Sequence, residues 1–270
     1  MTYFVREEPR TRDIIWVLTL HGMNTQGAWQ EDLNWLVSKS YGRMVPVAIY
    51  KYGIVRPGAV LKFRQRALTR GLINRIRRLS GETNAAGFGG VPDVIAHSFG
   101  TWLLGHALDA DRTLRVGRVI LTGCILRPDF DWNELITRGQ VQAVLCHVAT
   151  KDLWARIAHY FIPDSGPSGR RGFNDRRYIC HAVLSGGHSD FFNEKLMPGL
   201  FERIWQPFLI GTDGPPGDLE GKLSQPDWRQ VWWPFRATLP RFLVLGLVSA
   251  LVLLIFASLG LGAIRLLKFV

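Results

Sequence analysis

Residues 94–100 read VIAHSFG and are followed by TWLLGHALDA at residues 101–110. The first part is a short apolar run typical of a buried strand, and the second has the composition of a helix. The chain therefore turns abruptly from a strand into a helix at Ser98. Ala96 and Gly100 stand two residues before and two residues after that serine. Small residues at both places let strand and helix approach closely, and such a turn presents the serine at the carboxyl edge of a sheet.

The rest of the first 210 residues alternates between short apolar runs and longer helical patterns. Near-continuous apolar strands separated by helices indicate an α/β fold with a mostly parallel sheet covered by helices on both faces. The pattern predicts one domain over residues 1–210. Strands are expected at 14–20, 45–50, 94–96, 119–124, 144–149 and 178–184, and helices at 29–39, 59–79, 99–110, 153–161 and 193–209.

A serine nucleophile needs a histidine that accepts its proton. His188 is the preferred candidate, because it lies in the glycine-rich stretch 184–190, between the last expected strand and the last expected helix. A loop in that place can bring an imidazole over Ser98. The remaining histidines lie on expected strands or helices or beside a motif glycine and are interpreted as packed; they are His21, His97, His106, His147, His159 and His181.

The histidine in turn needs an acid that orients it. Asp152 follows the expected strand 144–149 almost directly, which places its carboxylate at the carboxyl edge of the sheet. Asp129 and Asp131, after the preceding strand, are the competing candidates. Asp190, two residues after the histidine, is interpreted as a residue that structures the loop. Asp152 is preferred because its position at a strand end is the more regular one.

A second motif follows the first expected strand, 14–20, where His-Gly is followed by Met23. A strand ending in His-Gly commonly precedes a loop that donates one backbone N–H to an oxyanion, and the residue after the nucleophile donates the second. The expected oxyanion hole therefore consists of the backbone N–H groups of Met23 and Phe99. An ordinary turn built on Gly22 is the alternative interpretation of this motif.

Taken together, these motifs resemble the α/β-hydrolase superfamily of serine hydrolases, of the lipase or esterase type. The resemblance covers roughly residues 14–209, and the chain order Ser98, Asp152, His188 matches the nucleophile–acid–histidine order of that family. It implies an eight-stranded, mostly parallel sheet and a mechanism in which the serine attacks an acyl carbonyl. Ala96 replaces the usual first glycine of the motif, a departure of one methyl group.

The implied activity is that of a membrane-anchored serine hydrolase that cleaves an acyl ester, either a lipid or a small ester. No cofactor and no metal are expected. The three cysteines form no CxxC pair and lie in apolar runs, which indicates buried thiols in a reducing compartment; they are Cys124, Cys146 and Cys180. Two alternatives stay open, a non-catalytic α/β-hydrolase-like membrane scaffold and a regulated effector lipase that targets a membrane.

The C-terminal part has a different composition. Residues 211–241 begin with a stretch rich in glycine and proline and continue into a tryptophan-rich segment, which predicts a linker followed by an interfacial segment. Residues 242–264 are 23 consecutive residues without a charge, more than the roughly 20 that a membrane-spanning helix needs. The prediction is a single-pass membrane protein with a cytoplasmic catalytic domain and a short tail at 265–270.

The net charge of +11 fits a surface held against anionic lipid, and no nucleic-acid partner is expected, since no recognition motif is present. Residues 62–79 carry seven of the positive charges and no acid, on an expected amphipathic helix that covers the sheet. Within the apolar span, small residues four apart make homodimerisation through the transmembrane helix a further expectation; the pairs are Gly246 with Ala250 and Ser258 with Gly262.

Overall fold

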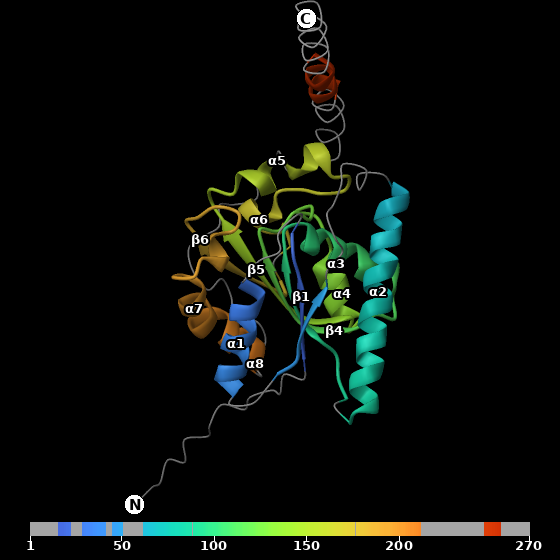
Figure 1. Ribbon diagram of the computed structural model, residues 1–270, viewed down its shortest axis with the longest axis vertical. Coiled ribbons are helices and arrows are strands. Elements are labelled where there is room, and N and C mark those ends of the chain that lie inside the picture. Colours follow the sequence, from blue (N-terminus) through green and yellow to red (C-terminus); the bar gives the residue numbers. More distant parts are fainter. Residues whose placement is uncertain are drawn as a thin grey trace, which may run out of the picture.

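Six parallel strands form one sheet in the computed structural model (Figure 1), which describes residues 16–22, 29–41, 45–50, 62–87, 89–175, 177–211 and 246–254. Their order across the sheet is β2-β1-β3-β4-β5-β6. Each predicted strand segment overlaps one of them, so the α/β fold and the parallel sheet are confirmed. The resemblance implied eight strands, whereas the described residues contain six. The strands are β1 (Val17–Leu20), β2 (Val47–Tyr50), β3 (Asp93–His97), β4 (Val116–Thr122), β5 (Val141–Ala149) and β6 (Ile179–Leu184).

The central strands are buried on both faces, which explains their near-continuous apolar sequences. Every residue of β1, β3 and β4 is buried. Successive residues of a strand point to opposite faces, and β3 follows this rule: Val94 and Ala96 contribute to one hydrophobic core and Ile95 to the other. A parallel sheet of this kind is stable only when helices cover both of its faces.

Helices cover both faces, as Figure 1 shows. The α2 and α3 side of the sheet includes Leu72 and Trp102 in its core, and the opposite side includes Leu33 of α1 and Trp205. The chain elements between the strands are α1 (Trp29–Tyr41), α2 (Lys62–Ala85), α3 (Phe99–Ala110), α4 (Trp132–Thr137), α5 (Leu153–Phe161) and α6 (Ser168–Arg171). After β6 come a 3₁₀ turn (Asp190–Phe192), α7 (Met197–Leu200), a π-helical turn (Phe201–Trp205) and α8 (Gln206–Ile210).

The C-terminal segment is described only at residues 246–254, which form a helix whose nine residues are all exposed. The predicted linker and interfacial segment beyond Gly211, most of the predicted 242–264 span, and the tail lie outside the described residues. In the part of the chain that the structure describes, no helix is long and apolar enough to cross a membrane. Gly246 and Ala250 lie in the described helix, while Ser258 and Gly262 do not.

Candidate active site

Ser98 occupies the sharp turn between β3 and α3. Its backbone has φ 53° and ψ −120°, a conformation that is costly for a residue other than glycine and that persists only where the surroundings impose it. Here the Ser98 N–H donates to the Thr122 carbonyl oxygen at 3.0 Å, and Thr101 Oγ1 donates to the Ser98 carbonyl oxygen at 2.6 Å. The strand-to-helix turn predicted from the sequence is therefore present, with the serine at its apex.

Gly100 shows why the turn requires a small residue two positions after the serine. A Cβ atom added there would lie 2.7 Å from the backbone oxygen of Leu20 and 2.9 Å from that of His21. Helix α3 thus begins in direct contact with the end of β1. Two residues before the serine, the buried methyl group of Ala96 is accommodated, so the departure from glycine leaves the turn intact.

His188 connects Ser98 with Asp152. The distance from His188 Nε2 to Ser98 Oγ is 2.8 Å, and the distance from His188 Nδ1 to Asp152 Oδ2 is also 2.8 Å. The histidine side chain is 14% exposed and the aspartate is fully buried. The structure thus brings together three residues that are separated by up to 90 positions in the chain.

The loop that carries His188 is held in place by Asp190. Its Oδ2 accepts a hydrogen bond from the Gly187 N–H at 2.8 Å. This contact confirms the interpretation of Asp190 as a residue that structures the loop.

Asp152 uses both of its carboxylate oxygens. Oδ2 faces the histidine, while Oδ1 accepts the Ala155 N–H at 2.7 Å and so caps the N-terminus of α5. The two competing acids have other partners: Asp129 pairs with Arg127 at 3.0 Å, and Asp131 caps α4. Of the three candidate acids, Asp152 is therefore the one that reaches the histidine.

Gly123, directly after β4, leaves the space that the His188 ring occupies. Its φ is +51°, and a Cβ atom added there would lie 2.8 Å from His188 Cε1 and 2.9 Å from Nδ1. Both the backbone conformation and the close approach require glycine at this position. No sequence motif marks this residue, because its importance depends on a contact between two distant segments.

If the protein has the acyl-ester activity expected from its sequence, Gly123→Ala is predicted to lower kcat/KM by about 100-fold, because the added methyl group displaces the His188 ring from its two partners. Gly139→Ala is the matched control. Gly139 also has a positive φ, +66°, but a Cβ atom there would have no neighbour within 4 Å. The control is expected to lose some stability and to keep its activity. Equal kcat/KM values for the two variants in a steady-state assay would contradict the role given to Gly123.

His97 lies next to the three side chains of Ser98, His188 and Asp152, and its ring packs against the His188 ring. Its Nδ1 is 3.2 Å from the Thr122 carbonyl oxygen, its Nε2 is 3.3 Å from Ser189 Oγ, and its ring centroid is 4.9 Å from that of His188. Burial, together with the nearby His188, lowers the pKa of His97 to about 3. His97 is therefore neutral near pH 7 and adds no positive charge beside the His188 imidazole.

A cavity of about 680 Å³ opens beside the serine. Its polar end is formed by Ser98, the two neighbouring histidines and Ser189. The rest is mostly apolar, and α5 provides much of it, because positions 154, 158 and 161 fall on one face of that helix. The apolar lining consists of Ile125, Trp154, Ala158, Phe161 and Ile162.

Only one of the two residues of the expected oxyanion hole lies within the described part of the chain. Phe99 is the first residue of α3, directly after the serine, as the prediction requires. Met23 lies outside the described residues. The residue pair before it is described: His21 Nδ1 lies 2.6 Å from the Gly22 carbonyl oxygen, and Gly22 lines the cavity.

No protein-family model matches the sequence, and no curated protein sequence matches it either. A solved structure does match: the crystal structure of the product of the gene lin2722 from Listeria innocua, with a TM-score of 0.50 and 12% sequence identity. The match covers 78% of this chain and 100% of that one. The two chains share a fold. At this identity the likeness concerns the fold alone.

Proposed function

We propose that this protein is a serine hydrolase that cleaves acyl esters through an acyl-enzyme. The observation that carries the proposal is the continuous chain of contacts from Asp152 through His188 to Ser98, with both distances 2.8 Å. A nucleophile, a base within hydrogen-bond reach and an acid that orients the base are the requirements of this chemistry. The order of the three residues along the chain, which matches that of α/β hydrolases, supports the proposal as well.

The mechanism has two stages. Ser98 Oγ attacks the acyl carbonyl carbon while its proton passes to His188 Nε2, and Asp152 stabilises the imidazolium that forms. The bond to the leaving alcohol then breaks, and the imidazolium returns the proton to the alcohol oxygen. A water molecule repeats the sequence on the acyl-enzyme and releases the carboxylic acid and the free serine. The Phe99 N–H is proposed to stabilise the negative charge on the carbonyl oxygen in both stages.

The shape of the cavity supports an acyl chain as the group next to the scissile carbonyl. Its polar end holds the triad serine and histidine, and the side chains of α5 and Ile125 form an apolar surface that leads away from them. Burying methylene groups against such a surface contributes about 0.8 kcal/mol for each group. The proposed substrates are therefore esters of medium-length or longer acyl chains.

The proposed function is tested by hydrolysis of p-nitrophenyl esters of different acyl length. The octanoate ester is expected to be cleaved with a higher kcat/KM than the acetate ester. Ala158→Phe is expected to reduce cleavage of the octanoate by about 10- to 100-fold and that of the acetate much less, because the larger side chain fills the apolar part of the cavity.

Ala85→Phe adds the same side chain at an exposed position near the end of α2 and serves as the control. A protein that cleaves neither ester would overturn the proposed function. An equal loss on both esters in Ala158→Phe would overturn the assignment of the acyl chain to this cavity.

The proposal includes attachment to a membrane through residues 242–264. The support is the length of this uncharged run, 23 residues, and the helical, fully exposed conformation of its described part. Leu247, Leu251 and Leu254 are each 59% or more exposed there. An exposed apolar helix of this kind is stable when a bilayer surrounds it. Attachment of the domain to a bilayer also supports lipid esters as substrates.

A further inference from the structure

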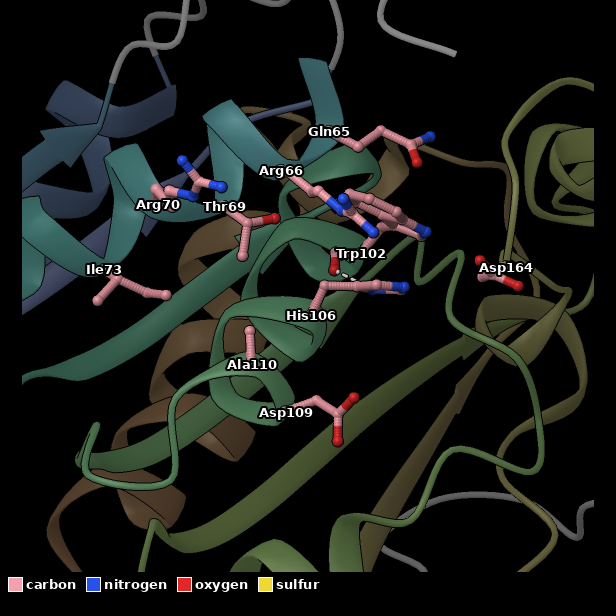
Figure 2. Close-up of a pocket in the computed structure, with 10 residues that line it drawn as sticks. All are labelled: Gln65, Arg66, Thr69, Arg70, Ile73, Trp102, His106, Asp109, Ala110 and Asp164. Atoms are coloured by element: carbon pink, nitrogen blue, oxygen red, sulfur yellow. Dashed lines mark hydrogen bonds between the residues drawn. The ribbon is translucent and has the colours of Figure 1, made fainter. Parts of the chain in front are cut away.

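A second cavity, of about 480 Å³, lies between α2 and α3 (Figure 2). The α2 side is formed by positions 65, 69 and 73, which fall on one face of the helix, together with Arg66 and Arg70. The α3 side is formed by Trp102 and residues one and two turns further along. The Trp102 indole N–H donates to the Pro163 carbonyl oxygen at 2.9 Å and so holds the neighbouring Asp164 beside the cavity.

The charges around this cavity are separated by sign. Arg66 and Arg70 lie on the α2 side, and Asp109 and Asp164 lie beyond the His106 ring, as Figure 2 shows. Within the described part of the chain, none of these four side chains forms an ion pair with another residue. Two cations therefore lie on one side of the cavity and two anions on the other, with the stacked rings of Trp102 and His106 between them.

A buried donor without a partner lies beside the same cavity. Gln65 is 7% exposed, and its side-chain amide nitrogen has no hydrogen-bond partner among the described residues. An unsatisfied buried donor of this kind costs about 1–3 kcal/mol. This nitrogen has almost no accessible surface, so a ligand oxygen can contact it only after the Gln65 side chain rotates toward the cavity.

The histidine at the other side of the cavity is an acceptor. Burial lowers the pKa of His106, so that its ring is neutral near pH 7. Its Nδ1 lies 2.9 Å from the Trp102 carbonyl oxygen and therefore carries the proton that this contact needs. The Nε2 atom of His106 is then left as an acceptor, on the same side of the cavity as the two aspartates.

These features define the chemistry of a matching ligand. Two guanidinium groups and the Thr69 side chain offer more donors than the two oxygens of a carboxylate use. A phosphate monoester has three terminal acceptor oxygens, and a diester has two terminal and two ester oxygens. The two carboxylates and the neutral imidazole suit an ammonium group. A cavity of this volume is within the usual range for a small-molecule site.

The geometry points to a binding site for a small phosphate-bearing zwitterion, with the phosphate held by Arg66 and Arg70 and the ammonium group by Asp109 and Asp164. Phosphoethanolamine has this chemistry, either as a free monoester or as the diester headgroup of a lipid. The site does not contain Ser98 and is independent of the proposed hydrolase activity.

The test is isothermal titration of the full chain in a non-ionic detergent with three soluble probes. These are phosphoethanolamine, glycerophosphoethanolamine as the diester headgroup, and inorganic phosphate. Phosphoethanolamine is expected to bind saturably, with a Kd about tenfold below that of inorganic phosphate. Binding of glycerophosphoethanolamine assigns the site to a lipid headgroup, and binding of the monoester without the diester assigns it to a free metabolite; both results support the proposal.

Variants separate the two charged ends of the site. Arg66→Gln is expected to weaken phosphoethanolamine binding by about tenfold or more, and Asp164→Asn is expected to lower its affinity to that of inorganic phosphate. Arg78→Gln is the matched control, because Arg78 lies on the same helix, away from the cavity, and pairs with Glu82 at 3.2 Å. All of these positions are exposed, so the variants are expected to fold.

Three outcomes would overturn the proposal. They are the absence of binding by all three probes, equal affinities of Arg66→Gln and Arg78→Gln, and phosphoethanolamine binding no more tightly than inorganic phosphate. Ser98→Ala is expected to bind phosphoethanolamine with unchanged affinity. A protein that binds phosphoethanolamine without hydrolysing esters would therefore overturn the proposed function and support this binding site. A protein that hydrolyses esters without binding phosphoethanolamine would support the proposed function and overturn this binding site.

Discussion

Ser98→Ala is expected to lower kcat for ester hydrolysis by about five to six orders of magnitude. The hydroxyl oxygen is the atom that forms the bond to the acyl carbon, and alanine has no atom that can replace it. The fold is expected to persist, because the turn is held by backbone contacts to Thr122 and by the close approach of Gly100 to β1 rather than by the Ser98 hydroxyl. Residual hydrolysis would come from direct attack by a water molecule on a substrate whose carbonyl oxygen is stabilised by the oxyanion hole.

Ser189→Ala is the control for that experiment. Ser189 lines the same cavity, and its hydroxyl oxygen lies 3.3 Å from His97 Nε2. It is therefore the alternative candidate for the nucleophile. Its replacement is expected to change kcat by no more than about fivefold, since it removes one hydrogen bond worth about 1 kcal/mol or less. A large loss in Ser189→Ala together with a small loss in Ser98→Ala would contradict the assignment.

Asp152→Asn is expected to lower kcat by about four orders of magnitude. The substitution separates the two roles of the side chain. The amide oxygen can still accept the Ala155 N–H and cap α5, and its NH₂ group then faces His188 Nδ1. An NH₂ group at that place favours the tautomer with the proton on Nε2, and an imidazole protonated there cannot accept the proton of Ser98.

The control for Asp152→Asn is the same substitution at Asp129, which the sequence left as a competing candidate for the acid that orients His188. Asp129→Asn removes a half-exposed pair with Arg127 and is expected to leave kcat unchanged. Circular dichroism of both variants checks that α5 and the sheet are intact. Wild-type activity in Asp152→Asn would show that the buried carboxylate serves only to cap the helix.

The sheet and the triad could be predicted because each depends on a local pattern with a physical cause. A strand buried on both faces has to be apolar throughout, and the order of such runs reveals the parallel sheet. The triad residues follow strands β3, β5 and β6, and parallel strands bring their carboxyl ends to one edge. Asp129 and Asp131 remained in competition with Asp152 because the sequence does not specify which loop reaches His188.

Other features depend on contacts between distant segments and had no local signal. Helices α4 and α6 are only 6 and 4 residues long, too short for an apolar period to be recognised. The predicted helix at 193–209 is divided, since α7 begins at Met197 and a π-helical turn precedes α8. The need for glycine at position 123 arises from the His188 ring, and the packing of His97 behind that ring follows from the same loop.

Covalent labelling shows whether Ser98 is the nucleophile. The full chain is treated with a fluorophosphonate, and the modified peptide is identified by mass spectrometry. We expect one adduct, on Ser98 in the peptide that contains residues 94–100. It should be absent in Ser98→Ala and form much more slowly in Asp152→Asn. A wild-type protein that forms no adduct, or that carries it on Ser189 or on any other residue, would contradict the assignment of Ser98 as the nucleophile.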